Sequence, residues 1–458
     1  MFSGFDFGTS NCAVGVMNPQ VDNQQVQLLP INNGQAFMPS ALYARRRELI
    51  CESAALMMKD KSSQDDYMKL RGGQLEAARR VRRQEDVRNG EQTVFVGQEA
   101  FDQYLNSPEE GYFVKSVKSF LGGSGLPPAA VQFFEDIVTT MMLTVKQRAE
   151  HQLQQEISHT VIGRPINFQG VYPEQSNLRA IEILTTSAKR AGFKAIEFLY
   201  EPLAAGMDFE LGLTEDKTVL IVDVGGGTTD CSMVRMGPSY RNNIERSNDF
   251  LGHSGDRIGG NDFDISVAGK LLMPLLGMQT TFKDGLPIPT QVFWSAVKTN
   301  NVGEQTLFNS ANTEDLLSQY YQKSAQPEIF QRFIKLHQEK KNHQLVRSAE
   351  QAKIGLSEIA NYQTDLSFIE DALSCEVTRD QFSRAVKDHV TRITQLIDEV
   401  LAQSQCQPDL IYITGGAAKS QIIRQVIESK FDDIEVVDGD HFGSVTKGLT
   451  VWSERLFA

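Results

Sequence analysis

The segment Val222-Asp223-Val224-Gly225-Gly226-Gly227-Thr228-Thr229-Asp230 lies between two hydrophobic runs, Thr218–Asp223 and Cys231–Met236. The first run predicts a buried strand, the glycine-rich segment a turn, and the second run the returning strand of a hairpin. Glycines let the backbone of such a turn approach an anion closely, so that several N–H groups point into one concavity and bind phosphate oxygens. The hydroxyl groups of Thr228 and Thr229 add further donors. We therefore expect a phosphate-binding turn.

The same pattern occurs near the N-terminus. Phe2–Phe7 predicts a strand, Gly8-Thr9-Ser10-Asn11 a turn, and Cys12–Met17 the return strand. Each copy has an aspartate near the end of its first strand, threonine and glycine in the turn, and a cysteine at the start of the second strand. We interpret the two copies as an internal duplication rather than as unrelated hairpins. Two such turns that face each other would hold a polyphosphate from both sides.

Each predicted first strand carries an aspartate near its end, Asp6 and Asp223. Carboxylates beside a phosphate would repel it unless a cation lay between them, and Mg²⁺ prefers oxygen ligands and keeps several of its waters. We expect Asp6 and Asp223 to hold Mg²⁺ through water, and Glu201 and Asp230 to orient the attacking water. Structural alternatives stay open, because a strand-end aspartate can stabilise a turn and Glu201 can cap a helix before Pro202.

Between and after the hairpins, helical and strand patterns alternate. The expected elements are a helix over Val131–Ile157, a strand over His159–Gly163, a helix over Asn177–Gly192, a strand over Ile196–Leu199, a helix-rich stretch to about Ser357, a strand over Leu410–Thr414 and a terminal helix over Gly443–Phe457. This β–α–β order predicts an α/β protein with a mixed sheet in each copy.

Composition and charge exclude several classes of protein. With 458 residues the chain is long enough for more than one domain, and its net charge of −13 disfavours a general affinity for nucleic acid or anionic membranes. Its five cysteines form no Cys-x-x-Cys pair, which argues against a disulfide framework and favours a reducing compartment. We find neither a signal-peptide pattern nor a hydrophobic run that could span a bilayer, so we expect a cytoplasmic protein.

Two polar segments interrupt the pattern. Arg45–Gln92 contains four arginines between positions 79 and 83, which could bind a partner or nucleic acid. Interleaved acidic residues favour instead the solvated face of a helix with Leu75, Ala78 and Val81 turned inward. The second segment, Thr280–His343, is rich in glutamine and predicts a helical subdomain.

Several segments, taken together, resemble motifs of the DnaK family, the 70-kilodalton heat-shock chaperones. They are Phe5–Asn11 and Val222–Asp230 (the two phosphate motifs), Glu201–Ala205 (the first connecting motif), Gly259–Asp264, Glu350–Lys353 with Ser357 (the adenosine-contacting helix) and Thr414–Gly416 with Lys419 (the adenosine loop). They occur in the family's order across nearly the whole chain, and they are similar to those of the bacterial YegD-type DnaK-like proteins.

The resemblance implies an α/β, actin-like ATPase fold, in which two lobes with duplicated ribonuclease-H-like cores surround a nucleotide cleft. Lobe I would span 1–216 with a subdomain inserted at about 40–125, lobe II 217–435 with one at about 258–377, and 436–458 would form a helix packed on lobe I. The cofactors would be ATP or ADP and Mg²⁺. Because only a short segment follows Lys419, we expect no peptide-binding domain.

The resemblance also assigns residues to the nucleotide. Phosphates would be held by Gly8, Thr9, Ser10, Asn11, Gly225, Gly226, Gly227, Thr228 and Thr229. Adenosine would be held by Glu350, Lys353, Ser357, Gly416 and Lys419, and the cofactor would also be bound by Gly260 and Gly415.

Two positions depart from the family's pattern. Phe101 stands where the family has a lysine beside the γ-phosphate, and loss of one charged donor there costs on the order of 10²–10³ in rate. Ile354 stands where the family has an arginine that stacks on adenine. We expect nucleotide binding to survive better than hydrolysis, and we leave open whether Lys115 or Lys118 replaces the missing lysine.

Three functions follow from this superfamily. Our main hypothesis is a nucleotide-dependent conformational switch with slow hydrolysis, a monomer or small oligomer that acts with an unknown protein client or co-chaperone. An actin-like filament protein is an alternative that sedimentation with ATP would reveal, although the segments at 45–92 and 280–343 disfavour it. A small-molecule kinase is another, and ATP consumption stimulated by a sugar or acid would reveal it.

Overall fold

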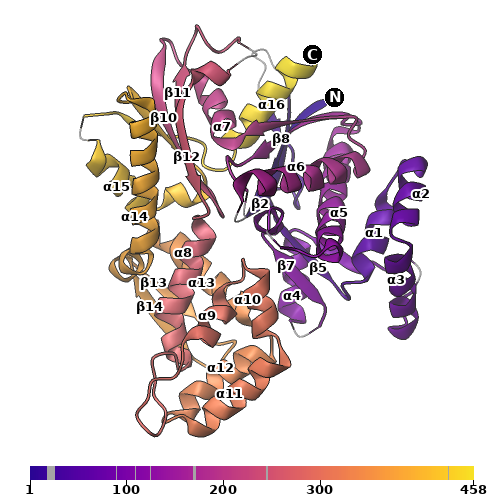
Figure 1. The fold of residues 1–458 in the computed structure, drawn as a ribbon, viewed down its shortest axis with the longest axis vertical. Coiled ribbons are helices and arrows are strands. Elements are labelled where there is room, and N and C mark those ends of the chain that lie inside the picture. The colour runs from indigo at the N-terminus through magenta and orange to yellow at the C-terminus, as the bar shows by residue number, and fades with distance from the viewer. Residues whose placement is uncertain are drawn as a thin grey trace. The chain divides into compact units, whose positions relative to one another are not determined.

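The computed structural model describes residues 1–17, 26–88, 90–108, 110–123, 125–168, 172–243, 246–431 and 433–458. Their contacts divide the chain into two compact units (Figure 1). The first unit comprises Met1–Arg257, Leu396–Gly416 and Asp432–Ala458, and the second comprises Ile258–Gln395 and Ala417–Phe431. Both copies of the predicted hairpin belong to the first unit.

The first sheet of this unit has the strand order β3-β2-β1-β8-β9, with β4 paired to β2. The strands are β1 (Phe2–Phe7), β2 (Asn11–Met17), β3 (Val26–Leu28), β4 (Met38–Pro39), β8 (His159–Arg164) and β9 (Ala195–Tyr200). β1 runs antiparallel to β2 and parallel to β8, which is parallel to β9. In this register Asp6 lies opposite Ala13.

The second sheet has the order β12-β11-β10-β15-β16. Its strands are β10 (Lys217–Val224), β11 (Thr229–Met236), β12 (Phe250–Asp256), β15 (Leu410–Thr414) and β16 (Val436–Asp438). β10 is antiparallel to β11 and parallel to β15, as β1 is to β2 and β8. Each strand of this second sheet therefore has a counterpart at the same place in the strand order of the first, and the predicted duplication is confirmed.

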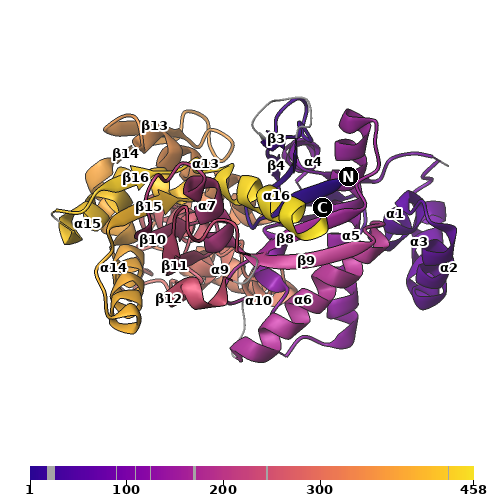
Figure 2. The same ribbon diagram turned by 90° about the horizontal axis from the view of Figure 1, so that it is seen from above.

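A helix follows the last strand of each sheet: α7 (Glu201–Glu210) after β9 and α16 (Ser444–Phe457) after β16. The two helices pack on each other, and each covers the other copy's sheet, α16 on β1, β2 and β8 and α7 on β10 and β11 (Figure 2). A Cβ atom at Gly448 would overlap the carbonyl oxygen of Ala204 and lie 2.9 Å from its Cα. Only a glycine allows the helices to approach this closely.

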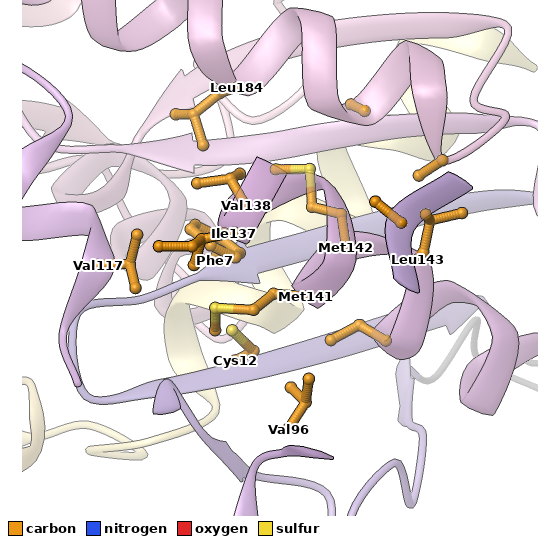
Figure 3. Close-up of a cluster of buried hydrophobic side chains, with 14 of the residues drawn as sticks. Phe7, Cys12, Val96, Val117, Ile137, Val138, Met141, Met142, Leu143 and Leu184 are labelled. Carbon is orange, nitrogen blue, oxygen red and sulfur yellow. The ribbon is translucent and has the colours of Figure 1, made fainter. Parts of the chain in front are cut away.

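The opposite side of the first hairpin is covered by α5 (Pro128–Leu153), on which α1 (Leu49–Met57) and α6 (Pro173–Arg190) pack. Figure 3 shows Phe7 and Cys12, at the base of the turn, among Ile137 and Met141 of α5. All four side chains are at most 1% exposed. Burying a side chain such as Phe7 contributes about 1.5–3 kcal/mol, so this core fixes the end of the hairpin that carries the turn.

The remaining elements of the first unit are α2 (Lys61–Leu70), α3 (Gly72–Gln84), α4 (Gln98–Asn106), the sheet of β6 (Val94–Val96), β5 (Ala41–Ala44) and β7 (Tyr112–Lys115), and the short helical turns η1 (Val117–Phe120) and η2 (Ser247–Asp249). On α3 the predicted inward-facing Leu75 and Ala78 are buried, whereas Val81 is half-buried. The fully buried Arg71 ties this region to α5, because its guanidinium contacts Asp136 at 2.9 Å and Glu135 at 2.7 Å.

The second unit is mostly helical. Its elements are α8 (Gly260–Val267), η3 (Ala268–Leu272), η4 (Met273–Leu276), α9 (Gln291–Val297), α10 (Val302–Phe308), α11 (Ala311–Lys323), α12 (Pro327–Gln338), α13 (Asn342–Leu356), the hairpin β13 (Asn361–Asp365) and β14 (Ser374–Thr378), and α15 (Gln421–Lys430). The helix α14 (Arg379–Ser404) and the turn η5 (Gly416–Lys419) cross the boundaries between the units.

The helical subdomain predicted for 280–343 is present as α9 to α12. Its core includes Phe293 and Phe333, whose rings stack at 4.2 Å. Among the described residues no helix is long and apolar enough to cross a bilayer.

Candidate functional site

The two predicted phosphate turns lie against each other within the first unit. A Cβ atom on Gly226 would overlap the hydroxyl oxygen of Ser10, and one on Gly227 would lie 2.6 Å from Cγ2 of Thr9. Glycine is thus required at both positions by the facing turn, not only by its own backbone. The structure therefore brings together four of the residues that the sequence assigned to phosphate.

Hydrogen bonds fix the shape of both turns. In the second turn the amide of Gly225 donates to the carbonyl of Thr228 at 2.9 Å. The first turn is held from outside by Ser40, whose hydroxyl donates to the carbonyl of Gly8 at 2.6 Å and whose amide donates to that of Ser10 at 2.8 Å. Ser40 was not predicted, because nothing in its sequence context connects it to the turn.

A small cavity of about 20 Å³ opens beside the turns. It is lined by Thr9, Lys118, Ser119, Pro165, Asn167, Phe168, Glu201, Gly227, Thr228 and Arg257. A space of this size holds about one water molecule. Binding of a phosphate group here therefore requires the lining side chains or the two turns to shift.

Carboxylates gather next to this cavity. Asp223 and Asp230 are partners in the register of β10 and β11, and both are at least 93% buried. Burial, followed by the charge of Glu201, raises the pKa of Asp6 and of Asp230 from 3.8 to about 7. The pKa of Asp223 is raised well above its usual value by burial and by the charges of Glu201, Asp230 and Asp6. The charge of Glu201 thus raises the pKa of all three predicted aspartates, which places the four acids close together.

Lys118 is a buried cation beside these acids. Its ammonium pairs with a carboxylate oxygen of Glu201 and donates to the carbonyl oxygen of Gly163 at 3.3 Å, and the residue is 5% exposed. Lys115, the other candidate for the missing lysine, has its ammonium 5.9 Å from the ring centroid of Phe101. Of these two lysines, only Lys118 lines the cavity of the described residues.

Glu201 begins α7, where the helix dipole favours a negative charge. The N-cap residue of α7 is Tyr200, and among the described residues no side chain caps this end of the helix. The capping role left open for Glu201 is therefore not observed, and its carboxylate turns to Lys118 instead. Asp230 is also oriented, because its Oδ1 accepts a hydrogen bond from the amide of Ile166 at 3.2 Å.

Phe101 does not line the cavity of the described residues. Its side chain is 7% exposed and packs on Phe113, with the ring centroids 5.2 Å apart, and beside Tyr104 and Ala100. The aromatic ring thus completes a small core at this position rather than contacting the turns.

The predicted adenosine residues fall into both units. In the second unit the ammonium of Lys353 lies 2.7 Å from a carboxylate oxygen of Asp264 and 3.2 Å from the carbonyl oxygen of Gly260. Glu350 lies one turn earlier on α13, and the hydroxyl of Ser357 donates to the carbonyl of Lys353 at 3.4 Å. Lys353 thus fixes the start of α8 to α13.

Of the remaining predicted residues, Lys419 is exposed in the second unit, and Gly415 and Gly416 belong to the first. Gly415 has a φ of 89°, and a Cβ on it would lie 2.5 Å from an oxygen of Asp223. The loop that the resemblance assigns to adenosine therefore begins beside the acidic cluster. Asn11 and Thr229 begin the return strands and flank the turns.

Comparisons with known proteins identify the family. The family model described as Hsp70 protein matches residues 129–274 and 316–448, more than half of the chain. Heat shock 70 kDa protein 13 of Homo sapiens is 23% identical over 448 residues, which cover 93% of this chain and 82% of that protein. The HscA homolog of Pseudomonas fluorescens, a chaperone protein, is 27% identical over 277 residues, 59% of this chain and 37% of that protein.

The duplicated sheets and the family match define the class: the chain has the α/β, actin-like ATPase fold predicted from its sequence. It belongs to the Hsp70 family, and it carries the ATPase domain of that family.

Proposed function

We propose that this protein is a chaperone-related switch whose conformation depends on bound ATP or ADP and which hydrolyses Mg-ATP slowly. The observation that carries this proposal is the contact between two glycine-rich turns beside a buried cluster of carboxylates. Ser10 lies against Gly226 and Thr9 against Gly227 where the turns meet, and Thr9, Gly227 and Thr228 line one cavity. Such facing turns suit the oxygens of a polyphosphate.

The acidic cluster fits Mg²⁺. Buried carboxylates that raise one another's pKa are costly, and a divalent cation removes that cost. Among the described residues no group of three or more His, Cys, Asp or Glu is arranged to hold a metal directly. Asp6 and Asp223 would therefore hold the ion through water, as the sequence predicts. The ion would supply charge neutralisation at the phosphates.

The chain's own residues suit slow hydrolysis. Asp230 and Glu201 would accept hydrogen bonds from the attacking water, and Asp230 is aimed by the amide of Ile166. The aromatic side chain at Phe101 removes one cation from the family's arrangement, which supports a rate lower by on the order of 10²–10³. The two-lobe domain limits, the relation to YegD-type proteins, the protein partner and the cytoplasmic location belong to the same proposal.

Limited proteolysis and X-ray scattering with Mg-ATP, Mg-ADP and no nucleotide test the switch, with phosphate release measured on the same samples. We expect different cleavage patterns with ATP and ADP, and release much slower than one turnover per second, the low end of typical enzymes. Identical patterns and scattering curves in all three conditions would contradict the switch. Rapid release would contradict slow hydrolysis, and pelleting with ATP would favour a filament.

A further inference from the structure

The segment that carries Lys118 is built into the same framework as the first phosphate turn. The amide of Ser116 donates to the carbonyl of Ser40 at 2.9 Å, and Ser40 in turn bonds both Gly8 and Ser10. On either side of Lys118, the side chains of Val117 and Phe120 are 0% and 6% exposed. Lys118 therefore has a backbone position fixed relative to the turn.

Packing holds this position from the other side as well. Figure 3 shows Val117 beside Phe7, the residue at the base of the first turn, and Ile137 of α5. Because dense packing resists displacement, the Lys118 side chain is directed from a rigid platform. Pairing with Glu201 and the carbonyl of Gly163 satisfies its ammonium, which would otherwise be costly to bury.

We propose that Lys118 is a positioning residue for ATP hydrolysis, which holds the carboxylate of Glu201 in the wall of the cavity. This inference rests on the proposed function and deepens it. Phe101 replaces the family's lysine beside the γ-phosphate, and Lys118 performs part of that lysine's role through Glu201. In the reaction a water oxygen bonds to the γ-phosphorus while the bond from that phosphorus to the ADP oxygen breaks. Glu201 accepts the proton that the water loses, and the products are ADP and inorganic phosphate.

Five variants test this role against the wild type: Lys118→Met, Lys118→Arg, Glu201→Gln, the double variant Lys118→Met/Glu201→Gln, and Lys115→Met as a matched control. ATP affinity is measured by calorimetry and hydrolysis by single-turnover experiments. We expect Lys118→Met to slow hydrolysis by about 10–10²-fold while ATP affinity changes by less than about threefold. Lys118→Arg should recover part of the rate, and Lys115→Met should behave as wild type.

The double variant separates positioning from direct action on ATP. If Lys118 acts through Glu201, the double variant hydrolyses no more slowly than Glu201→Gln alone. A rate reduced by the product of the two single effects would overturn the proposal, as would a wild-type rate for Lys118→Met. Loss of ATP affinity in step with the rate would also overturn it, because Lys118 would then bind ligand.

Two further variants separate the role of Lys118 from a folding defect and from a role of Arg257. Should Lys118→Met fail to fold, Lys118→Gln, which keeps a donor for the Gly163 carbonyl but no charge, carries the same expectation. Arg257, which lines the same cavity, is replaced by Gln in a separate variant; a loss confined to that variant would assign the role to Arg257 and overturn the proposal. Failure of the wild type to bind ATP would be seen first, and would contradict the proposed function itself.

Discussion

The hairpins β1–β2 and β10–β11 occupy equivalent places in two sheets of the same topology, yet their chemistry differs. Asp223 has another aspartate, Asp230, as its register partner, whereas Asp6 lies opposite Ala13. In the return strand of each hairpin, the residue before the cysteine is Asn11 in the first copy and Asp230 in the second. Both turns carry hydroxyl groups, but the second hairpin carries two aspartates and three consecutive turn glycines where the first has one aspartate and one turn glycine. The two copies therefore share a frame and differ in the side chains that they place at it.

The two crossing helices differ in the same way. α7 begins with Glu201, which faces Lys118, whereas α16 begins with Ser444, whose hydroxyl hydrogen-bonds that of Thr414 at 2.6 Å. The strand-to-helix connection therefore carries an acid in one copy and a neutral hydroxyl in the other. A symmetric pair of sheets thus produces an asymmetric site, in which Glu201, the proposed base, and its partner Lys118 both come from the first copy.

Replacing Gly226 by Val tests the contact between the turns and has the largest expected effect. The added side chain would overlap the Ser10 hydroxyl, so the turns cannot face each other as described. We expect loss of the stabilisation by Mg-ATP, which is about 4 kcal/mol at 1,000 times the Kd, in a thermal-shift assay. Gly73→Ala, at the exposed start of α3 where a Cβ meets nothing within 4 Å, is the control at an unrelated glycine. A full shift with Gly226→Val would contradict the contact.

Replacing the two helix glycines compares the crossing helices. At Gly448 a Cβ meets the backbone of Ala204, which cannot yield, whereas at Gly206 it meets the ends of the Met236 and Ile221 side chains. We expect Gly448→Ala to lower the free energy of unfolding by about 3 kcal/mol or more and Gly206→Ala by about 1 kcal/mol. Urea unfolding measures both. Equal losses would show that the helices cross less closely than described.

Replacing Asp230 by Asn makes the second hairpin like the first at this position, and its effect depends on pH. Because the pKa of Asp230 in the folded protein is raised from 3.8 to about 7, the native state holds a proton that the unfolded chain releases. This contribution favours folding at low pH and is lost as the pH rises toward 7. At pH 8 the ionised carboxylate is destabilising.

Without nucleotide or Mg²⁺, Asp230→Asn should therefore be more stable than wild type at pH 8, by roughly 1–4 kcal/mol, and the gain should be clearly smaller at pH 5. Urea unfolding at the two pH values checks this. The control is Asp60→Asn. Asp60 is the exposed N-cap of α2, and the hydrogen bond from Ser63 lowers the pKa of its carboxyl, so this variant should give no gain in the free energy of unfolding at pH 8. A gain for Asp230→Asn that is the same at both pH values would contradict the electrostatic explanation.

Thiol labelling gives the smallest effect and compares the bases of the hairpins. Cys12 and Cys231 are both 0% exposed, and burial raises the pKa of Cys12 to about 12 and raises that of Cys231 as well. We expect neither to react with a disulfide reagent in the native protein while the half-buried Cys406 does, and both to react once the protein is denatured. Rapid labelling of either one would show that its hairpin opens locally.

Much of the fold was predictable because the signals are local. The alternation of hydrophobic runs and glycine-rich turns gave both hairpins, and the strand bounds differ from those expected by a residue or two. The crossing of α7 and α16 could not be predicted from the sequence, because Gly448 and Ala204 are far apart in it.

The site was predictable in part, for the same reason. Asp6, Asp223 and Asp230 belong to local patterns, but Lys118 lies 83 residues from Glu201 and no spacing connects them. The support that Ser40 gives to the first turn also has no sequence signature. The packing of Phe101 into an aromatic cluster becomes visible only once β5, β6 and β7 are assembled.

Calorimetric titration of the wild-type protein with ATP, with and without Mg²⁺, tests directly whether the two hairpins clamp a phosphate chain. We expect one site per chain and an affinity that falls markedly when Mg²⁺ is removed, because the carboxylates of Asp6, Asp223 and Asp230 would then repel the phosphates. No binding in either condition, or an affinity that does not depend on Mg²⁺, would contradict a phosphate clamp built from the two hairpins.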